Sequence, residues 1–264
     1  MNKNNAIILF SIVIIFLTVY LRNIVSGQSN PNDTQSQISS PTPASPQSKS
    51  TLTLDLEINE KKIRVLWLKI EDSGRIQLFS NFSESLTSDQ AIENNPCSSL
   101  ISGGFYTQEN TPIGLFVTEG RQISSHSQNK LLNGVFSINY DQKPKITSFL
   151  PEENLRLGLQ SGPILVNEAG SINIPQVKEE YARRVVVAIS EDDEIIFMVF
   201  YDKDSVFMGP KLTELPEAVL TVSEKIGVGV KNALNLDGGS ASAFYSQDIK
   251  LRELTPLGSY FCIK

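Results

Sequence analysis

With 264 residues, the chain is long enough for a short targeting segment and one domain with a substantial core. Acidic residues outnumber basic ones by 29 to 23, and no Lys/Arg cluster is present, which argues against a nucleic-acid partner. Two cysteines and one histidine, His126, are too few for a disulfide scaffold or a multi-histidine zinc site. Carboxylates, hydroxyls and arginines therefore remain as the candidate catalytic groups.

The first predicted segment is a hydrophobic N-terminus. Residues 6–21 read AIILFSIVIIFLTVYL, a run without a charge, and extension to Val25 supplies the length that a membrane span needs. We interpret residues 1–25 as a signal anchor that passes the membrane once. Cleavage near Val25-Ser26-Gly27, which would release a secreted protein, is the alternative.

A polar stretch follows over residues 26–50. It contains four prolines, and Ile38 is its only large apolar residue, so folding would bury too little surface to offset the loss of chain entropy. We predict a disordered linker here and a folded domain over residues 51–264. That domain has 20 basic and 28 acidic residues.

Short strands dominate the predicted domain. Apolar residues alternate with polar ones over 52–58, and a turn at 59–61 leads into a second alternating run up to residue 70, which predicts a hairpin. The other predicted strands cover residues 99–101, 113–117, 135–139, 164–166, 185–189, 195–200, 233–236, 241–245 and 259–263.

Two helices complete the prediction. Apolar residues at helical spacing predict a helix over 214–226, with Thr213 as its N-cap and Gly227 as its stop, and a second helix is expected over 85–94. The predicted fold class is α+β, a single domain built on a mixed β-sheet with few helices.

The most informative motif is NALNLDGGSASAFY, residues 232–245. An apolar strand delivers Asp237 at its end, and Gly238 and Gly239 allow a tight turn with exposed backbone amides, next to the hydroxyl of Ser240. Such a turn is suited to an anion such as phosphate. An ordinary Asp-Gly hairpin turn is the alternative interpretation.

A second glycine pair lies in SGGFY. Gly103 and Gly104 end an apolar strand, and Phe105 and Tyr106 follow them. Two strand ends that both turn on Gly-Gly would face one pocket, in which the ring of Tyr106 would suit the face of a sugar.

Two further segments carry polar groups beside strands. In LGLQSGPILV, Gln160 and Ser161 precede a Gly-Pro turn, which is also explained by a plain turn. In YARRVVVAIS, strand alternation points Arg183 and Arg184 to opposite faces. One guanidinium would then enter a site while the other faces solvent.

The order of these four segments, from about residue 100 to 245, resembles the phosphodiester glycosidase family. The best-known member of that family removes N-acetylglucosamine from the phosphodiester on lysosomal mannose phosphate. The resemblance implies an extracytoplasmic hydrolase that cleaves a sugar from a phosphate-linked carbohydrate or a cell-envelope glycopolymer.

The resemblance also implies roles for individual residues. Asp237 would orient a water molecule or stabilise the developing oxocarbenium ion, and Arg184 would hold the phosphate. No metal-ligand spacing is present, although a divalent cation is compatible with phosphate beside Asp237. The substrate-binding residues implied are Gly103, Gly104, Phe105, Tyr106, Gln160, Ser161, Gly238, Gly239 and Ser240.

The sequence differs from the family pattern at three positions near the proposed site. Ser102 replaces the usual Asn, Thr107 a frequent acidic residue, and Ser240 a frequent third glycine. They support an alternative, a catalytically impaired carbohydrate-binding or envelope-scaffolding domain. No motif identifies a second carboxylate, and the candidates Glu109, Glu119 and Glu168 have the character of surface residues.

The pairing of the two cysteines depends on the compartment in which the domain lies. An oxidising compartment outside the cytoplasm would allow Cys97 and Cys262 to form a disulfide that pins the C-terminal strand to the strand of the first glycine turn. Two separate buried thiols are the alternative.

Overall fold

The computed structural model describes residues 51–151, 154–174 and 180–264. These residues belong to one compact unit, Gln47–Lys264. The predicted anchor over 1–25 and the predicted linker over 26–50 lie outside the described residues. Within the described part of the chain, no helix is long and apolar enough to cross a membrane.

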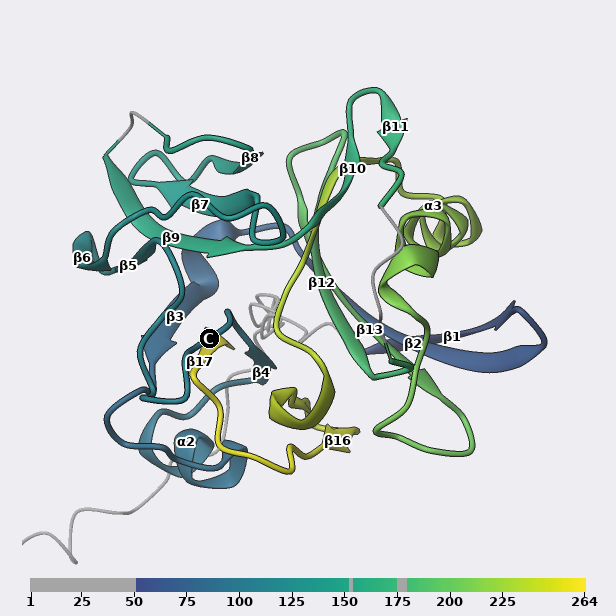
Figure 1. The fold of residues 1–264 in the computed structure, drawn as a ribbon, viewed down its shortest axis with the longest axis horizontal. Coiled ribbons are helices and arrows are strands. Elements are labelled where there is room, and N and C mark those ends of the chain that lie inside the picture. Colours follow the sequence, from purple (N-terminus) through teal and green to yellow (C-terminus); the bar gives the residue numbers. More distant parts are fainter. Residues whose placement is uncertain (1–50, 152–153, 175–179) are drawn as a thin grey trace, which may run out of the picture. The chain divides into compact units, whose positions relative to one another are not determined.

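The largest sheet has seven strands in the order β1-β2-β13-β12-β14-β10-β11 (Figure 1). The predicted hairpin is confirmed as β1 and β2, which pair from Leu52 opposite Trp67 to Ile58 opposite Lys61. Asn59 and Glu60 both have positive φ in its turn, as a tight two-residue hairpin requires. The strands are β1 (Leu52–Ile58), β2 (Lys61–Ile70), β10 (Ile164–Asn167), β11 (Gly170–Ser171), β12 (Arg184–Ser190), β13 (Ile195–Asp202) and β14 (Val230–Asn235).

Two smaller sheets have five strands each. One has the order β16-β15-β4-β17-β3, with β3 (Ile76–Ser80), β4 (Ser99–Ser102), β15 (Phe244–Tyr245), β16 (Lys250–Leu251) and β17 (Ser259–Ile263). The other has the order β6-β5-β9-β7-β8, with β5 (Phe116–Thr118), β6 (Arg121–Ser124), β7 (Gly134–Asn139), β8 (Pro144–Thr147) and β9 (Leu155–Ser161).

The prediction of one mixed sheet is wrong, because all strand pairs among the described residues are antiparallel and they form three sheets. Parallel neighbours need long crossover connections, and this chain has few helices to provide them. The strands that were not predicted are β3, β6, β8, β9, β11 and β16. Their apolar runs are short or interrupted, as in β9 by Arg156 and Gly158.

The helices α2 (Ser88–Asn94) and α3 (Leu215–Ile226) lie close to their predicted positions. Gly227 ends α3 in the left-handed conformation, as predicted. Thr213 is not its N-cap, because residues Leu212–Glu214 form a 3-10 turn and Glu214 takes the N-cap position. Two more 3-10 turns, Ser73–Arg75 and Gly239–Ala241, complete the description.

The seven-stranded sheet separates two hydrophobic clusters. On one face, Val186 and Ala188 of β12 join a cluster with Leu215, Val219 and Val222 of α3. On the other face, the alternate residues of β12 join a cluster with side chains from both five-stranded sheets. The domain thus has a sheet with one helix on one face and two small sheets on the other (Figure 1).

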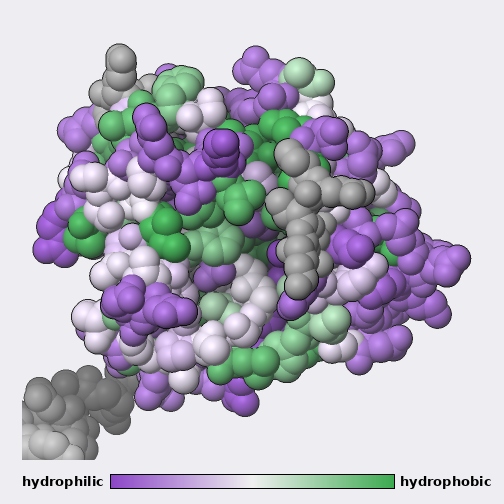
Figure 2. Space-filling view, viewed as in Figure 1, coloured by the Kyte–Doolittle hydropathy of each residue, from purple (hydrophilic) through white to green (hydrophobic). Residues whose placement is uncertain are grey.

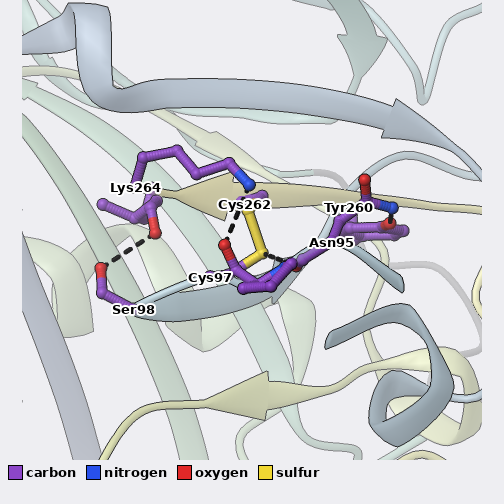
Figure 3. Close-up of a disulfide and its surroundings, with 8 residues drawn as sticks. Asn95, Cys97, Ser98, Tyr260, Cys262 and Lys264 are labelled. Carbon is purple, nitrogen blue, oxygen red and sulfur yellow. Dashed lines mark hydrogen bonds between the residues drawn. A yellow bond between two sulfur atoms is a disulfide. The ribbon is translucent and has the colours of Figure 1, made fainter. Parts of the chain in front are cut away.

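A disulfide joins Cys97 to Cys262 of β17, and the Cα atoms are 5.3 Å apart, within the range that a disulfide requires (Figure 3). Hydrogen bonds surround it: Ser98 Oγ donates to the carbonyl oxygen of Ile263 at 2.9 Å, and Asn95 Nδ2 donates to Tyr260 Oη at 3.1 Å. The C-terminal strand is therefore fixed beside β4, the strand that leads to the first glycine turn.

Candidate active site

The two glycine turns meet at Asp237. The backbone N–H of Asp237 donates to the carbonyl oxygen of Gly103 at 2.9 Å. In return, the hydroxyl of Ser102 donates to the carbonyl oxygen of Asp237 at 3.2 Å. The end of β14 and the end of β4 are thereby held together, although the two strands belong to different sheets.

The start of β12 lies on the other side of Asp237. Leu236 N–H donates to the carbonyl oxygen of Val185 at 2.8 Å, and Gly239 N–H donates to that of Arg183 at 2.8 Å. Arg184 therefore lies beside Asp237 at the same end of two neighbouring strands. Its guanidinium donates to the carbonyl oxygens of Pro210 at 3.1 Å and Glu180 at 2.7 Å.

Close backbone approach explains two of the glycines. A Cβ on Gly238 would lie 2.6 Å from the carbonyl oxygen of Arg183, and a Cβ on Gly103 would lie 2.5 Å from Ser259 Oγ. Real Cβ atoms do not approach so closely. Glycine at position 103 therefore lets the end of β4 approach β17, and glycine at position 238 lets the segment after β14 approach the start of β12.

Asp237 is half-buried as a residue. Burial of its carboxyl group raises the pKa of that group to about 7. The backbone N–H of Gly238 acts in the opposite direction, because it donates to the ionised form. Near neutral pH this group therefore exchanges between a carboxylate and a carboxylic acid, which suits proton transfer.

Arg183 is the buried arginine of the pair, and the sequence did not identify its role. Its Nε donates to Ser242 Oγ at 2.7 Å, and its Nη2 donates to the carbonyl oxygens of Ser242 and, at 2.8 Å, Arg252. Burial lowers its pKa to about 10, so it remains charged at neutral pH. Glu253 lies near enough to favour that charge. Arg183 thus holds the turn after Asp237 in shape.

Ser161 and Asn235 link the end of β9 to the end of β14, next to Asp237. Ser161 Oγ donates to the carbonyl oxygen of Asn235 at 2.8 Å, and Asn235 Nδ2 donates to the carbonyl oxygen of Gly162 at 2.8 Å. Among the described residues, no donor reaches the buried Oδ1 of Asn235. The sequence did not single out Asn235, although it precedes Asp237 by two residues and was visible in the motif.

Gln160 has a different environment from Ser161. Its Oε1 accepts the backbone N–H groups of Leu115 and Ser127, each at 3.0 Å. Its Nε2 donates to the carbonyl oxygens of Ser127 at 2.7 Å and Leu132 at 2.8 Å. The amide is fully used in holding a loop, so Gln160 supports the fold here and has no hydrogen-bonding group left for a substrate.

The aromatic residues after the first glycine turn are only half-buried. Tyr106 Oη donates to the carbonyl oxygen of Pro256 at 2.7 Å, and its ring packs so closely on Gly258 that a Cβ there would lie 2.3 Å from Tyr106 Cδ1. The carbonyl oxygen of Phe105 accepts the N–H of Ile113 at 3.0 Å. Contact of either ring with a sugar stays a prediction.

Ser240 is exposed next to the Asp237 turn, and its carbonyl oxygen accepts the N–H of Leu254 at 2.7 Å. The three glutamates considered from the sequence, Glu109, Glu119 and Glu168, are exposed. In the described ranges there is no group of three or more His, Cys, Asp or Glu residues that could hold a metal ion, and a cation held by Asp237 and phosphate stays a prediction.

The comparison with known families matches the same part of the chain. The family model for phosphodiester glycosidases matches residues 95–260, a range that contains every segment of the site. The chain belongs to the phosphodiester glycosidase family. No curated protein matches the chain significantly.

Solved structures share the phosphodiester glycosidase fold of this chain. The catalytic domain of zebrafish N-acetylglucosamine-1-phosphodiester alpha-N-acetylglucosaminidase, auto-inhibited by its pro-peptide, is 14% identical with a TM-score of 0.64, over 81% of this chain and 82% of that one. A hypothetical protein from Synechocystis is 12% identical, with a TM-score of 0.53 over 80% and 61% of the two chains. A putative exported protein from Burkholderia pseudomallei is 10% identical, with a TM-score of 0.52 over 77% and 74%. Identities this low establish the common fold alone.

Proposed function

We propose that this phosphodiester glycosidase family member hydrolyses a sugar phosphodiester at the glycosidic bond. The observation that carries the proposal is the meeting of four separate chain segments at Asp237, a carboxyl group with its pKa raised to about 7. Arg184, on the neighbouring strand, is the cation of the site. A carboxyl group and a guanidinium at one edge match the two needs of the reaction.

In the proposed reaction, water attacks the anomeric carbon while the bond from that carbon to the phosphate oxygen breaks. The phosphate monoester leaves with the bonding electrons, and the proton of the water passes to the Asp237 carboxylate. A phosphate monoester is already a good leaving group, so strong general-acid help is unnecessary. Arg184 would stabilise the phosphate charge by paired hydrogen bonds.

The substrate class and location are part of the same proposal. A phosphate-linked carbohydrate or cell-envelope glycopolymer fits a domain held outside the cytoplasm, anchored by residues 1–25 and spaced by residues 26–50. The Cys97–Cys262 disulfide supports that placement, because disulfides persist in oxidising compartments.

The test is hydrolysis of the methyl phosphodiester of N-acetylglucosamine 1-phosphate, measured as release of free sugar. Asp237→Asn removes the titrating carboxyl group and keeps its size, so turnover should fall at least about a hundredfold, which corresponds to about 2.7 kcal/mol of transition-state stabilisation. Asp248→Asn, which changes an exposed aspartate further along the chain, is the matched control and should keep the wild-type rate.

Equal rates for wild type and Asp237→Asn would remove the assignment. Binding of the diester without release of sugar would favour the second candidate, a carbohydrate-binding or scaffolding domain. One observation speaks for that candidate: the Ser102 hydroxyl is committed to the backbone of Asp237, where the family usually has an amide side chain.

A further inference from the structure

The two five-stranded sheets meet along the outer edge of β3, which is the last strand of its sheet. The N–H of Lys264, just after β17, donates to the carbonyl oxygen of Arg75 at 3.0 Å. Backbone groups point alternately to the two sides of a strand, so Gln77 faces β17, whereas Ile76 and Leu78 face away from it. The backbone edge at Ile76 and Leu78 is therefore left for the other sheet to cover.

Side chains of the other sheet cover this edge in place of a strand. Arg156 Nη1 of β9 donates to the carbonyl oxygen of Ile76 at 2.8 Å. Thr118 Oγ1 of β5 donates to the carbonyl oxygen of Leu78 at 2.5 Å. The N–H of Leu78 points the same way as its carbonyl oxygen and has no acceptor among the described residues, although Leu78 is only 3% exposed. A buried N–H of this kind needs an acceptor from a water molecule or a ligand.

A cavity of about 360 Å³, here called the β3 cavity, lies at this junction and is large enough for a small ligand. Leu78 and Arg156 line it, together with Glu119 and Tyr140 from the turns after β5 and β7. Arg156 is held at both ends of its guanidinium, because its Nη2 also donates to the carbonyl oxygen of Ser73 at 2.9 Å. Contacts within the fold therefore fix the walls of the cavity.

The groups that line the β3 cavity suit a neutral sugar. Tyr140 is 54% exposed, and its hydroxyl lies so close to Gly120 that a Cβ there would stand 2.1 Å from it. A tyrosine that is held at its hydroxyl and more than half exposed is suited to packing on the apolar face of a pyranose. The carboxylate of Glu119 and the N–H of Leu78 supply an acceptor and a donor for sugar hydroxyls.

Charge and surface character argue against other classes of ligand. Arg156 is the only basic residue in the described lining and Glu119 is the only acidic one, so their charges offset and neither an anion nor a cation is favoured. On the face shown in Figure 2, polar and apolar residues are intermixed over the side that carries β5, β6 and β9 in Figure 1. A large apolar partner would need a continuous patch. A small neutral ligand with several hydroxyls is the class that fits.

The β3 cavity is separate from the edge at Asp237. Arg156 lies near the start of β9, whereas Ser161, which donates to the carbonyl oxygen of Asn235, lies at the end of that strand. The five residues from one to the other span about 17 Å of extended strand. A sugar in the cavity would therefore not occupy the position of the reacting bond.

We propose that the β3 cavity is a second carbohydrate site, which binds one neutral pyranose unit and takes no part in the reaction at Asp237. The pyranose packs on Tyr140, and its hydroxyl groups bond to Glu119 and to the N–H of Leu78. A site of this kind attaches the domain to a neutral glycan, whatever the reaction at Asp237 consumes. The inference goes beyond the proposed function, because it requires no hydrolysis.

The experiment titrates the full-length chain with three neutral probes, the methyl glycosides of glucose, galactose and N-acetylglucosamine. Binding is followed by nuclear magnetic resonance of the probe, which detects weak complexes. At least one probe should bind with a Kd of about 10 mM or tighter. Asp237→Asn should leave that Kd unchanged, because the cavity lies away from the candidate active site.

Variants of exposed residues test the two side-chain contacts. Tyr140→Ala should weaken binding of that probe at least about tenfold, whereas Tyr140→Phe, which keeps the ring, should weaken it less than about threefold. Glu119→Gln, which removes the charge of the acceptor, should weaken binding about threefold. The matched controls are Phe149→Ala, an aromatic residue that is 64% exposed, and Glu109→Gln, an exposed glutamate. Both controls should bind the probe as the wild type does.

Two results would overturn the inference: no binding of any of the three probes, or an effect of Phe149→Ala as large as that of Tyr140→Ala. Failure of the proposed function looks different. If the chain binds a probe through Tyr140 but releases no sugar from the methyl phosphodiester of N-acetylglucosamine 1-phosphate, the second site stands and the hydrolysis falls. If the chain hydrolyses the diester and Tyr140→Ala binds every probe as the wild type does, the hydrolysis stands and the second site falls.

Discussion

The α3 face of the large sheet buries apolar side chains, whereas the edge at Asp237 buries polar and charged ones. Under α3, Leu215, Val219 and Val222 are buried against apolar residues of the sheet. At the edge, Arg183 and Asn235 are buried polar groups, and Asp237 is a carboxyl group whose pKa is raised by burial. Burial of apolar groups under α3 stabilises the fold, whereas burial of polar groups at the edge costs free energy.

Function is expected at the polar edge and not under α3. A carboxyl group whose pKa is raised by burial, and the Asn235 amide oxygen, which no donor in the described part of the chain reaches, each cost free energy. Proteins keep such groups mainly where they serve a purpose. Mutations under α3 should therefore change the free energy of unfolding and leave the rate of the folded protein intact. Mutations at the edge should lower the rate of the folded protein and change the free energy of unfolding less.

The largest change in stability is expected under α3. Leu215→Ala removes a side chain with no exposed surface and leaves a cavity, so the free energy of unfolding should fall by about 2–5 kcal/mol. Urea unfolding measures this. Below the unfolding transition, turnover of the methyl diester per folded molecule should match wild type, and a hundredfold loss of turnover there would break the contrast between the two regions.

Removal of the disulfide should have the next largest effect. Replacing Cys97 and Cys262 together by serine should lower the free energy of unfolding by about 2–4 kcal/mol, because the unfolded chain loses a long closed loop. The rate should persist, since Gly103 stays tied to Ser259 by its own N–H at 2.9 Å. A count of two free thiols per chain in denatured, unreduced protein would contradict the pairing.

A smaller loss of stability with a large loss of rate is expected for Gly238→Ala. The new Cβ would lie 2.6 Å from a backbone oxygen, so the turn must shift, at a cost of about 1–3 kcal/mol. That shift moves Asp237, and turnover should fall at least about tenfold. Gly229→Ala, just before β14, is the control, because its Cβ meets only the flexible side chain of Glu191. Equal rates for the two variants would show that the turn has no part in the reaction.

The individual strands and helices were predicted better than the way in which the strands pair into sheets. The hairpin β1–β2, most strands and α3 follow from alternation and helical spacing, which are local properties of the chain. The division into three antiparallel sheets is not local. It depends on contacts such as that between Gly103 and Asp237, which are far apart in sequence.

The candidate site was also predicted in part: its position along the chain followed from local motifs, whereas the environment of each side chain did not. The motifs predicted that Asp237, Arg184 and both glycine turns converge on one cleft. The structure brings the backbone of these segments together, and a cleft between them stays a prediction. Alternation placed Arg183 and Arg184 on opposite faces, but it did not show which one is buried. Gln160 looked like Ser161 in sequence, yet its side chain points to the loop 126–133, because adjacent residues of a strand face opposite ways.

A prediction about pH tests the electrostatics of the edge directly. Burial raises the pKa of Asp237 from 3.8 in an unfolded chain to about 7 in the folded protein. Between these two values the folded protein binds a proton that the unfolded chain has released. The contribution of Asp237 to stability is therefore fully present below pH 3.8 and is lost as the pH rises through about 7. Asp237→Asn has no proton to lose, so this part of the pH dependence should vanish in the variant.

The measurement is the urea midpoint of wild type and Asp237→Asn at several pH values from 4 to 8. The difference between the two midpoints should shift in favour of the variant as the pH rises and level off above about pH 7, because Asp237 is then ionised in both states. Other titrating groups cancel in the comparison, since they are common to both proteins. A constant difference across the range would mean that the Asp237 carboxyl group is well solvated in the folded protein. The contrast between the apolar α3 face and the buried polar groups at the edge would then lose its electrostatic basis.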